Sequence, residues 1–359
     1  MTLKYFTDAN SAAGYVSLQK ENLTGISTIY HLKGPDASLV HHLLARLSNS
    51  LVPQQLNPEY IYSTFNPKFL AGLVIRELDI AFTSGKNVLD EAGSIDLMPA
   101  YEASTVTESQ DKINQLQIEA EQYYEKMYMH LNAALHIHDE WEKIYIDRMD
   151  FEKANQFRKG LIERLFETEI PPTLSLEDQS ASARVVRRFF GASTPDGLSD
   201  FIPELTSGLK RYLIKGRPGS GKSTLMKEVV AKAVALGYDA DVYHCSLDPK
   251  SLDMVVIPEL NFCIFDATAP HAYEATFVKD EIVDTYSAFI RQGTDERCAD
   301  ILEAIENKYK NQLRLALLAM GNGHDCLEAL SSLYKTAMVT EKVDEIVARL
   351  ADELLSRKA

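Results

Sequence analysis

The chain contains an internal repeat, which requires two units of one architecture and therefore constrains the fold more than any single motif. When the sequence is shifted by 182 positions, residues 249–260 fall on residues 67–78 with seven identities in twelve positions. The same shift, without a gap, places Gly216 on Gly34. The sequence therefore predicts two copies of one module.

The boundary between the copies is predicted in the segment 167–188. Pro171 and Pro172 stop a preceding helix, and the serine-rich stretch after them has no apolar periodicity. This gives a first module over 1–166, a linker over 167–188 and a second module over 189–359. A chain of 359 residues is long enough for two such domains.

The second module reads as alternating strands and helices. Apolar strands are expected at 211–216, 241–246 and 262–266, and an amphipathic helix at 222–236. From Glu281 onward the pattern is mainly helical. The predicted fold class is α/β, with two tandem P-loop NTPase-like modules, each a mostly parallel sheet flanked by helices, with helical extensions.

The first module has the same layout with a longer helical section over 108–166. An apolar stripe that includes Ile113, Leu116, Met127 and Leu131 runs along it. Such a stripe is typical of a packing face, for example a helical hairpin lying against the sheet, and less often of an elongated coiled coil.

Residues 216–223 of the second module predict phosphate binding directly, because they satisfy the pattern GxxxxGK[ST] between a strand and a helix. In such a loop, backbone N–H groups surround phosphate oxygens and the helix N-terminus adds positive charge. We expect Lys222 to neutralise the β- and γ-phosphates, Ser223 to ligate Mg²⁺ and Thr224 to lie close to the α-phosphate. The expected ligands are ATP or GTP with Mg²⁺. The predicted binding residues are Gly216, Arg217, Pro218, Gly219, Ser220, Gly221, Lys222, Ser223 and Thr224.

Asp266 ends an apolar strand, which places its carboxylate at the sheet edge where ligands of open α/β sheets bind. We expect it to hold Mg²⁺ through a water; the alternative is a helix cap. Ala267 follows it, where many vigorous ATPases carry a carboxylate that polarises the attacking water. The sequence therefore disfavours a fast mechanical motor.

Four further side chains near this edge have two interpretations each. Asp248 and, less strongly, Asp253 are candidates to bind an acceptor hydroxyl and take its proton; the alternative for Asp248 is a turn-forming residue before proline. His271 is a candidate phosphate contact or an ordinary loop imidazole. Arg217 either contacts the γ-phosphate or points to solvent.

Apart from the Mg²⁺ site at Ser223 and Asp266, the sequence predicts no metal site. His138 and Glu142 recur as His324 and Glu328, 186 positions later, and we interpret each pair as a hydrogen-bonded contact on a packed helix, because a third ligand is not evident. His244 and Cys245 are adjacent on a strand and point to opposite faces. The four cysteines lack metal-site spacing and read as reduced structural thiols.

The first module lacks the phosphate-binding chemistry. The 182-residue shift places Ala37 on Gly219, Leu39 on Gly221, Val40 on Lys222 and His41 on Ser223, and Ser84 on Asp266. Asp36 would oppose a phosphate. We therefore expect a degenerate module that acts as a packing partner, a regulatory surface or a platform for another ligand.

Charge and hydropathy exclude some partners. With 37 Lys and Arg against 52 Asp and Glu, the formal charge of -15 opposes binding to nucleic acid or to an anionic membrane. The N-terminal residues lack the apolar core of a signal peptide, and no stretch is long and apolar enough to cross a bilayer. The sequence predicts a cytoplasmic protein.

The stretches LTSGLKRYLIKGRPGSGKSTLMKEV, VYHCSLDPKSLDMVVIPEL and IFDATAPH resemble a bacterial family of tandem-duplicated P-loop NTPases, generally labelled ATPases or nucleotide-kinase-like proteins. The resemblance covers nearly the whole chain. It implies a P-loop NTPase fold in each half, with Lys222, Ser223 and Asp266 on nucleotide-binding positions. Similar members often keep an intact loop in the first module, and this chain departs from them at residues 37–41.

The leading functional hypothesis is a slow Mg²⁺-dependent ATP-hydrolysing switch, in which nucleotide at the second module alters its packing against the first and signals to a partner protein. Lys222, Asp266 and Asp248 are the predicted catalytic residues. The first alternative is a kinase that transfers the γ-phosphoryl group to a small molecule. The second is a sensing scaffold that binds nucleotide and releases it unchanged.

Overall fold

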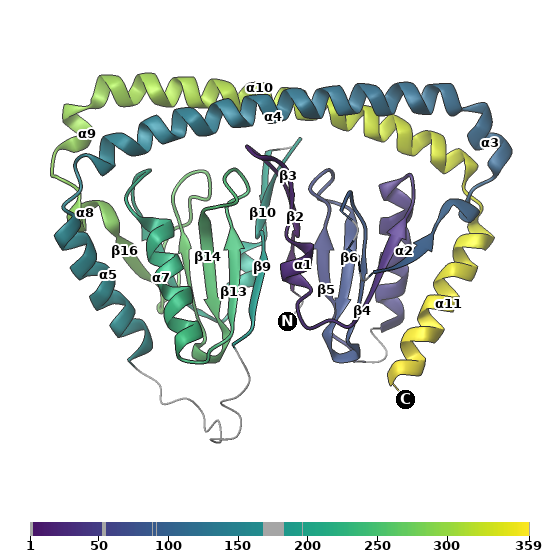
Figure 1. Cartoon of the computed structure of the whole chain (residues 1–359), viewed down its shortest axis with the longest axis horizontal. Helices are drawn as coiled ribbons and strands as arrows, with labels where there is room; N and C mark the ends of the chain where they lie inside the picture. The colour runs from purple at the N-terminus through teal and green to yellow at the C-terminus, as the bar shows by residue number, and fades with distance from the viewer. Residues whose placement is uncertain are drawn as a thin grey trace.

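A computed structural model describes residues 3–51, 55–87, 89–90, 92–167, 183–195 and 197–358. The chain forms two similar six-stranded mixed sheets, spanned at one end by two long helices (Figure 1). In order across the first sheet, the strands are β1 (Lys4–Tyr5), β5 (Glu59–Tyr62), β6 (Leu70–Ile75), β7 (Ile80–Thr83), β4 (Thr28–Lys33) and β8 (Gly93–Asp96). In the second they are β16 (Glu281–Asp284), β12 (Lys210–Lys215), β15 (Phe262–Asp266), β14 (Leu252–Ile257), β13 (Ala240–His244) and β9 (Val185–Arg188).

Two hairpins and a set of helices complete the architecture. The hairpins are β2 (Asp8–Ser11) with β3 (Gly14–Ser17), and β10 (Gly191–Thr194) with β11 (Gly197–Asp200). The helices of the first half are α1 (Gln19–Asn22), α2 (Ala37–Leu51), α3 (Ala103–Glu108), α4 (Gln110–Ile146) and α5 (Phe151–Phe166), with short 3₁₀ turns η2 (Arg76–Leu78) and η3 (Met98–Ala100). Those of the second half are α6 (Ile202–Leu205), α7 (Lys222–Ala235), α8 (Thr285–Phe289), α9 (Thr294–Arg297), α10 (Ala299–Ala337) and α11 (Thr340–Lys358), with the 3₁₀ turn η5 (Pro258–Leu260).

The internal duplication is visible in the strand register. Tyr30 of β4 pairs with Phe82 of β7, and Tyr212 of β12 pairs with Ile264 of β15, so both pairs differ by the same 182 positions. The turn before β7 and the turn before β15 each contain one residue with positive φ, Asp79 at 56° and Asn261 at 53°. The two halves therefore share their strand register and the conformation of this turn.

Each sheet is mixed, with five strands in one direction and one antiparallel strand, β6 in the first sheet and β14 in the second, which the mostly parallel sheet of the prediction did not include. Strand β12 is parallel to β15 and β16, but β14, a strand that the sequence did not predict, is antiparallel to β13 and β15. The connection from β14 to β15 is the short segment 258–261. Because a parallel neighbour requires a crossover of a dozen or more residues, so short a connection forces an antiparallel pair.

Two segment boundaries also differ from the prediction. Residues 281–284 form strand β16 before the helical region begins, and residues 185–188, placed in the linker, form strand β9 at the edge of the second sheet. Both are short edge strands, whose weak apolar pattern is easily missed. Residues 168–182 of the predicted linker lie outside the described residues.

The two halves exchange their C-terminal helices. Helix α4 leaves the first module, runs antiparallel beside α10 and delivers α5 to the second sheet, while α10 delivers α11 to the first (Figure 1). Leu161 and Leu165 of α5 are buried with α7, and Leu350 and Leu354 of α11 are buried with α2. Each half therefore completes the core of the other.

The predicted stripe of the helical section 108–166 is a packing face, but its partner is not its own sheet alone. Ile113 and Leu116 join the first core, whereas Met127 and Leu131 pack against α10. Periodicity indicates which residues are buried without indicating against what, so the sequence suggested a local hairpin. The structure has a long antiparallel helix pair, which we call the helical arm (α4 and α10).

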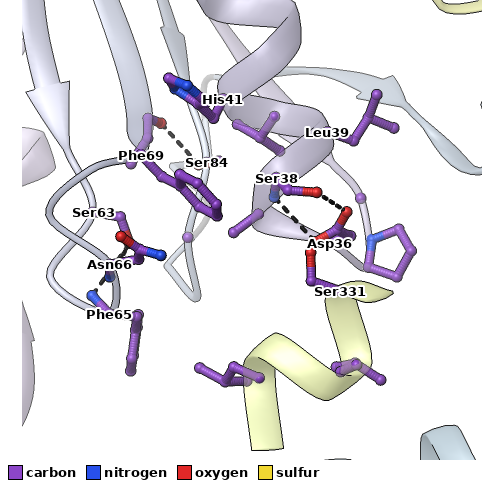
Figure 2. Close-up of a pocket in the computed structure, with 18 of the residues that line it drawn as sticks. Asp36, Ser38, Leu39, His41, Ser63, Phe65, Asn66, Phe69, Ser84 and Ser331 are labelled. Atoms are coloured by element: carbon purple, nitrogen blue, oxygen red, sulfur yellow. Dashed lines mark hydrogen bonds between the residues drawn. The ribbon is translucent and has the colours of Figure 1, made fainter. Parts of the chain in front are cut away.

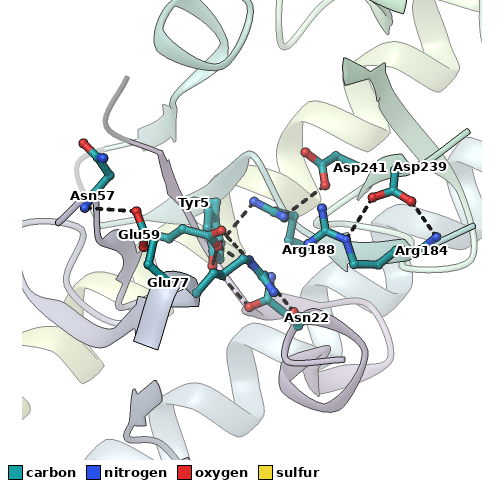
Figure 3. Close-up of polar contacts among 10 residues, drawn as sticks. Tyr5, Asn22, Asn57, Glu59, Glu77, Arg184, Arg188, Asp239 and Asp241 are labelled. Atoms are coloured by element: carbon teal, nitrogen blue, oxygen red, sulfur yellow. Dashed lines mark hydrogen bonds and ion pairs between the residues drawn. The ribbon is translucent and has the colours of Figure 1, made fainter. Parts of the chain in front are cut away.

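The sheets meet edge to edge at the centre of the molecule. The amide of Phe6 donates to the carbonyl of Phe189 at 2.9 Å, and the reverse bond is 2.8 Å. Beside this bridge, the buried guanidinium of Arg188 lies 3.1 Å from the Asp241 carboxylate and stacks 4.3 Å over the Tyr5 ring (Figure 3). Glu59 lies 3.9 Å from the same guanidinium, so one cation joins carboxylates of both halves.

Among the described residues, no helix combines the length and the apolar character that a membrane span requires. The four cysteines are unpaired, and three of them are buried.

The central cation provides a stability prediction. Arg188→Ala leaves Asp241 without its buried partner and Glu59 paired with Arg76, and should lower the free energy of unfolding by about 3–5 kcal/mol. Arg184, which pairs with Asp239 at 3.1 Å but is 40% exposed, is the control, and Arg184→Ala should cost less than about 1 kcal/mol. Urea denaturation of both variants measures the difference; equal costs would contradict the role given to Arg188.

Candidate functional site

The glycine-rich loop (residues 216–221) joins the end of β12 to the start of α7, so the strand, turn and helix lie where the sequence predicts them. Gly219 and Gly221 have φ of 73° and 77°, a left-handed conformation that residues with a Cβ rarely adopt. A Cβ on Gly216 would collide with the side-chain oxygens of Thr285 and Ser220. The glycines are therefore required by the backbone path of this loop.

Lys222 and Asp266, which the sequence predicts to act together, are neighbours. The Lys222 ammonium lies 3.4 Å from Asp266 Oδ2 and donates to the carbonyl of Arg217 at 3.1 Å. Asp266 Oδ1 accepts from the amide of Thr268 at 3.0 Å, which fixes the carboxylate at the edge of the sheet. The site thus combines a cation at a helix N-terminus with an oriented carboxylate.

Ser223, on the first turn of α7, accepts a hydrogen bond from the amide of Leu252 at 2.9 Å. A hydroxyl oxygen has two lone pairs, so this bond fixes its direction and leaves one pair for another ligand. Thr224 is the next residue and is exposed.

The two candidate bases differ in position. Asp248 forms a turn, which is the structural alternative given for it from the sequence: its carboxylate accepts a hydrogen bond from the amide of Lys250 at 3.2 Å. Asp253 is the second residue of β14 and lies near Asp266 on the neighbouring strand β15. Burial and the neighbouring Asp266 carboxylate raise the pKa of Asp253 to about 6. Asp253, ranked below Asp248 from sequence, therefore has a pKa in the range that suits a proton acceptor near neutral pH.

His271 and Arg217 are each held by a carboxylate. His271 is buried, with its Nδ1 3.2 Å from Asp200 Oδ2 and its ring edge-on to Phe190. Arg217 pairs with Asp295 at 2.7 Å. These contacts fix the orientation of both side chains.

Helix α4 of the first module lies directly on the glycine-rich loop. The amide of Gly219 donates to Glu142 Oε1 at 3.2 Å, and a Cβ on Gly219 would lie 2.5 Å from the Glu142 carbonyl oxygen. His138 Nδ1 is 3.8 Å from the same carboxylate oxygen. Sequence reasoning missed these residues because it treated the pair as helix packing. The recurrence of the pair 186 positions later was the available signal, since both helices of the arm carry it.

Asp139 lies next to His138 and Glu142 on α4. It is the third potential metal ligand that was not evident from the sequence. Ligand atoms of His138, Asp139 and Glu142 all lie within 4.8 Å of one another. Burial lowers the pKa of His138; the Glu142 carboxylate opposes this shift, and the Lys222 ammonium adds to it. Because that ammonium also opposes a bound cation, we assign no metal to the cluster.

The corresponding region of the first module has a different local structure. Helix α2 begins at Ala37, the counterpart of Gly219, so its first turn fills the space of the loop. Asp36 caps this turn, accepting from the amide of Ser38 at 3.0 Å. His41 Nδ1 accepts from the amide of Leu70 at 3.1 Å, which reproduces the bond of Ser223 to Leu252. The scaffold is retained and the phosphate-binding groups are absent.

A cavity of about 950 Å³ lies at this edge of the first sheet. Figure 2 shows Asp36, Ser38 and Ser331 on one side of it and Asn66 and Phe69 on the other. His324 and Glu328 of α10 also line it, in the position that His138 and Glu142 occupy over the second module.

Comparisons with family models, with curated proteins and with solved structures found no match. The family resemblance and the roles of the site residues therefore stay predictions.

The contact between loop and helix can be tested by two matched substitutions. Gly219→Ala and Gly221→Ala both place a Cβ at positive φ, which costs about 1–2 kcal/mol. Only the Cβ at 219 meets α4, since the space around Gly221 is open. Gly219→Ala should therefore lower the free energy of unfolding by roughly 1–3 kcal/mol more than Gly221→Ala. Urea denaturation measures both, and equal losses would argue against the packing of α4 on the loop.

Asp253 predicts a pH dependence of stability. Between about pH 4 and about pH 6 the folded protein holds a proton on Asp253 that the unfolded chain has lost, so this residue lowers the free energy of unfolding as pH rises. The free energy of unfolding of Asp253→Asn minus that of the unsubstituted protein should therefore increase between about pH 4 and about pH 7, by at most about 3 kcal/mol. Denaturation at both pH values, with the exposed Asp352→Asn as control, measures this. A pH-independent difference would be incompatible with the raised pKa.

Proposed function

We propose that this protein is a P-loop NTPase whose second module binds ATP or GTP with Mg²⁺ and hydrolyses it slowly as a switch. One observation carries the proposal: a loop with two left-handed glycines lies between β12 and α7, with Lys222 and Asp266 3.4 Å apart beside it. Loop amides, a helix N-terminus and an ammonium group are the donors that a polyphosphate requires.

The residues fit Mg²⁺ as well as phosphate. The Ser223 hydroxyl keeps one lone pair free, and Asp266 Oδ2 faces Lys222 while Oδ1 is held by Thr268. Hard oxygen ligands of this kind suit Mg²⁺, which neutralises phosphate charge when bound. Ser223 would ligate the ion directly and Asp266 through a water.

Slow hydrolysis is favoured because Asp266 is followed by the buried Ala267, so no carboxylate stands at that position to polarise water. The helical arm offers the route for a switch, since Glu142 of the first module contacts the loop of the second. A change at the loop thus reaches the other half of the chain.

Phosphoryl transfer to a small molecule is the second candidate, favoured by Asp253. Its pKa of about 6 suits a base that takes a proton from an acceptor hydroxyl near neutral pH. Phosphate release without an acceptor supports the switch, and ADP formation that depends on an acceptor supports the kinase. Tight binding with neither supports a sensing scaffold.

Nucleotide binding is tested at Lys222. Lys222→Ala removes a charged donor to the phosphates, usually worth about 1.5–3 kcal/mol, and should weaken Mg²⁺-ATP binding roughly 10- to 100-fold. Lys227→Ala, at an exposed position on the same helix, should change the affinity by less than about twofold because solvent screens that charge. Titration calorimetry measures both variants. An affinity that Lys222→Ala leaves unchanged, or no affinity in the unsubstituted protein, would rule the proposal out.

A further inference from the structure

The loop that would hold phosphate already donates to an anion from the same chain. The amide of Gly219 bonds to Glu142 Oε1 at 3.2 Å, although the two residues belong to different modules. Carboxylate oxygens and phosphate oxygens are both negatively charged acceptors and suit the same amide donors. Glu142 therefore makes the kind of contact that a phosphate oxygen makes in a phosphate-binding loop.

We infer that Glu142 is a built-in competitor of nucleotide, an autoinhibitory contact that a triphosphate must displace. The inference rests on the proposed function, because it concerns regulation of the same site. The amide of Gly219 offers one proton, so a bond to phosphate there weakens the bond to Glu142. The Glu142 carboxylate and a bound phosphate would also repel each other, because both are negatively charged and both would lie at the amide of Gly219. Lys222 is the cation that α7 supplies to this site.

Helix α4 cannot move alone, because side chains next to Glu142 connect it to helix α10 and to the glycine-rich loop of the second module. Trp141 and His138 pack against Tyr309 of α10, with ring centroids 6.0 and 5.9 Å apart. One turn further, the Tyr145 hydroxyl donates to Asp295 at 2.9 Å, and Asp295 is also the partner of Arg217 in the loop. Release of Glu142 therefore acts on both helices of the arm.

The far end of the arm explains what the competition would control. Helix α10 continues from Tyr309 to His324 and Glu328, which line the cavity of the first module. The exchange of Glu142 for a phosphate would thus link occupancy of the second module to the shape of that cavity. The first module would then be the part of the protein whose conformation responds to nucleotide.

The experiment compares Glu142→Gln with Glu140→Gln, which makes the same charge change at an exposed position two residues away. We expect Glu142→Gln to bind Mg²⁺-ATP roughly 5- to 30-fold more tightly than the unsubstituted protein, and Glu140→Gln to bind it as the unsubstituted protein does. Titration calorimetry gives the affinities. Lys222→Ala added to Glu142→Gln should remove the gain, which shows that the tighter binding uses the same loop.

Trp141 is the only tryptophan in the chain and adjoins Glu142, so its fluorescence reports the position of α4 without relying on turnover. Mg²⁺-ATP should shift its emission in the unsubstituted protein. Glu142→Gln should show part of that shift before nucleotide is added.

Equal or weaker ATP affinity in Glu142→Gln, with unchanged tryptophan emission, would overturn the inference and leave the proposed function standing. Absence of nucleotide binding in both proteins would overturn the proposed function and the inference together.

Discussion

Each sheet of this protein has an apolar surface that the helices of its own half leave incomplete, and the rest of the architecture depends on that constraint. Leu350 and Leu354 of α11 fill the first core, and Leu161 and Leu165 of α5 fill the second. Burial of such side chains stabilises a fold by about 1.5–3 kcal/mol each. Because both connections must cross the whole molecule, α4 and α10 become long helices that lie side by side.

The crossing also determines the composition of the candidate site. To reach the second sheet, α4 has to pass the carboxyl ends of its strands, where the glycine-rich loop lies. The contact of Glu142 with Gly219 is therefore a consequence of the helix exchange, and the site is built from both halves of the chain. A second module expressed without α4 would lack one wall of its own site.

The sequence predicted those features that depend on local constraints, namely the duplicated α/β units, the loop and its flanking strand and helix. It could not predict the exchange, because the apolar stripe through Met127 and Leu131 shows burial without naming α10 as the partner. Nor could it distinguish the surroundings of the two aspartates, which it ranked with Asp248 first. Asp248 lies in a turn and Asp253 on an antiparallel strand beside Asp266, a difference that depends on the unpredicted β14.

The two halves satisfy the same electrostatic demand in different ways. A helix N-terminus with free amides attracts negative charge. In the first module Asp36, one residue before α2, supplies that charge through a bond within its own turn, and the loop has become helix from Ala37 onward. In the second module the carboxylate comes from Glu142 on a distant helix. A local cap forms together with its helix, whereas the carboxylate of a distant helix would, under the proposed function, be exchanged for a phosphate oxygen. On that proposal, the difference would account for a first module without nucleotide and a second module that nucleotide switches.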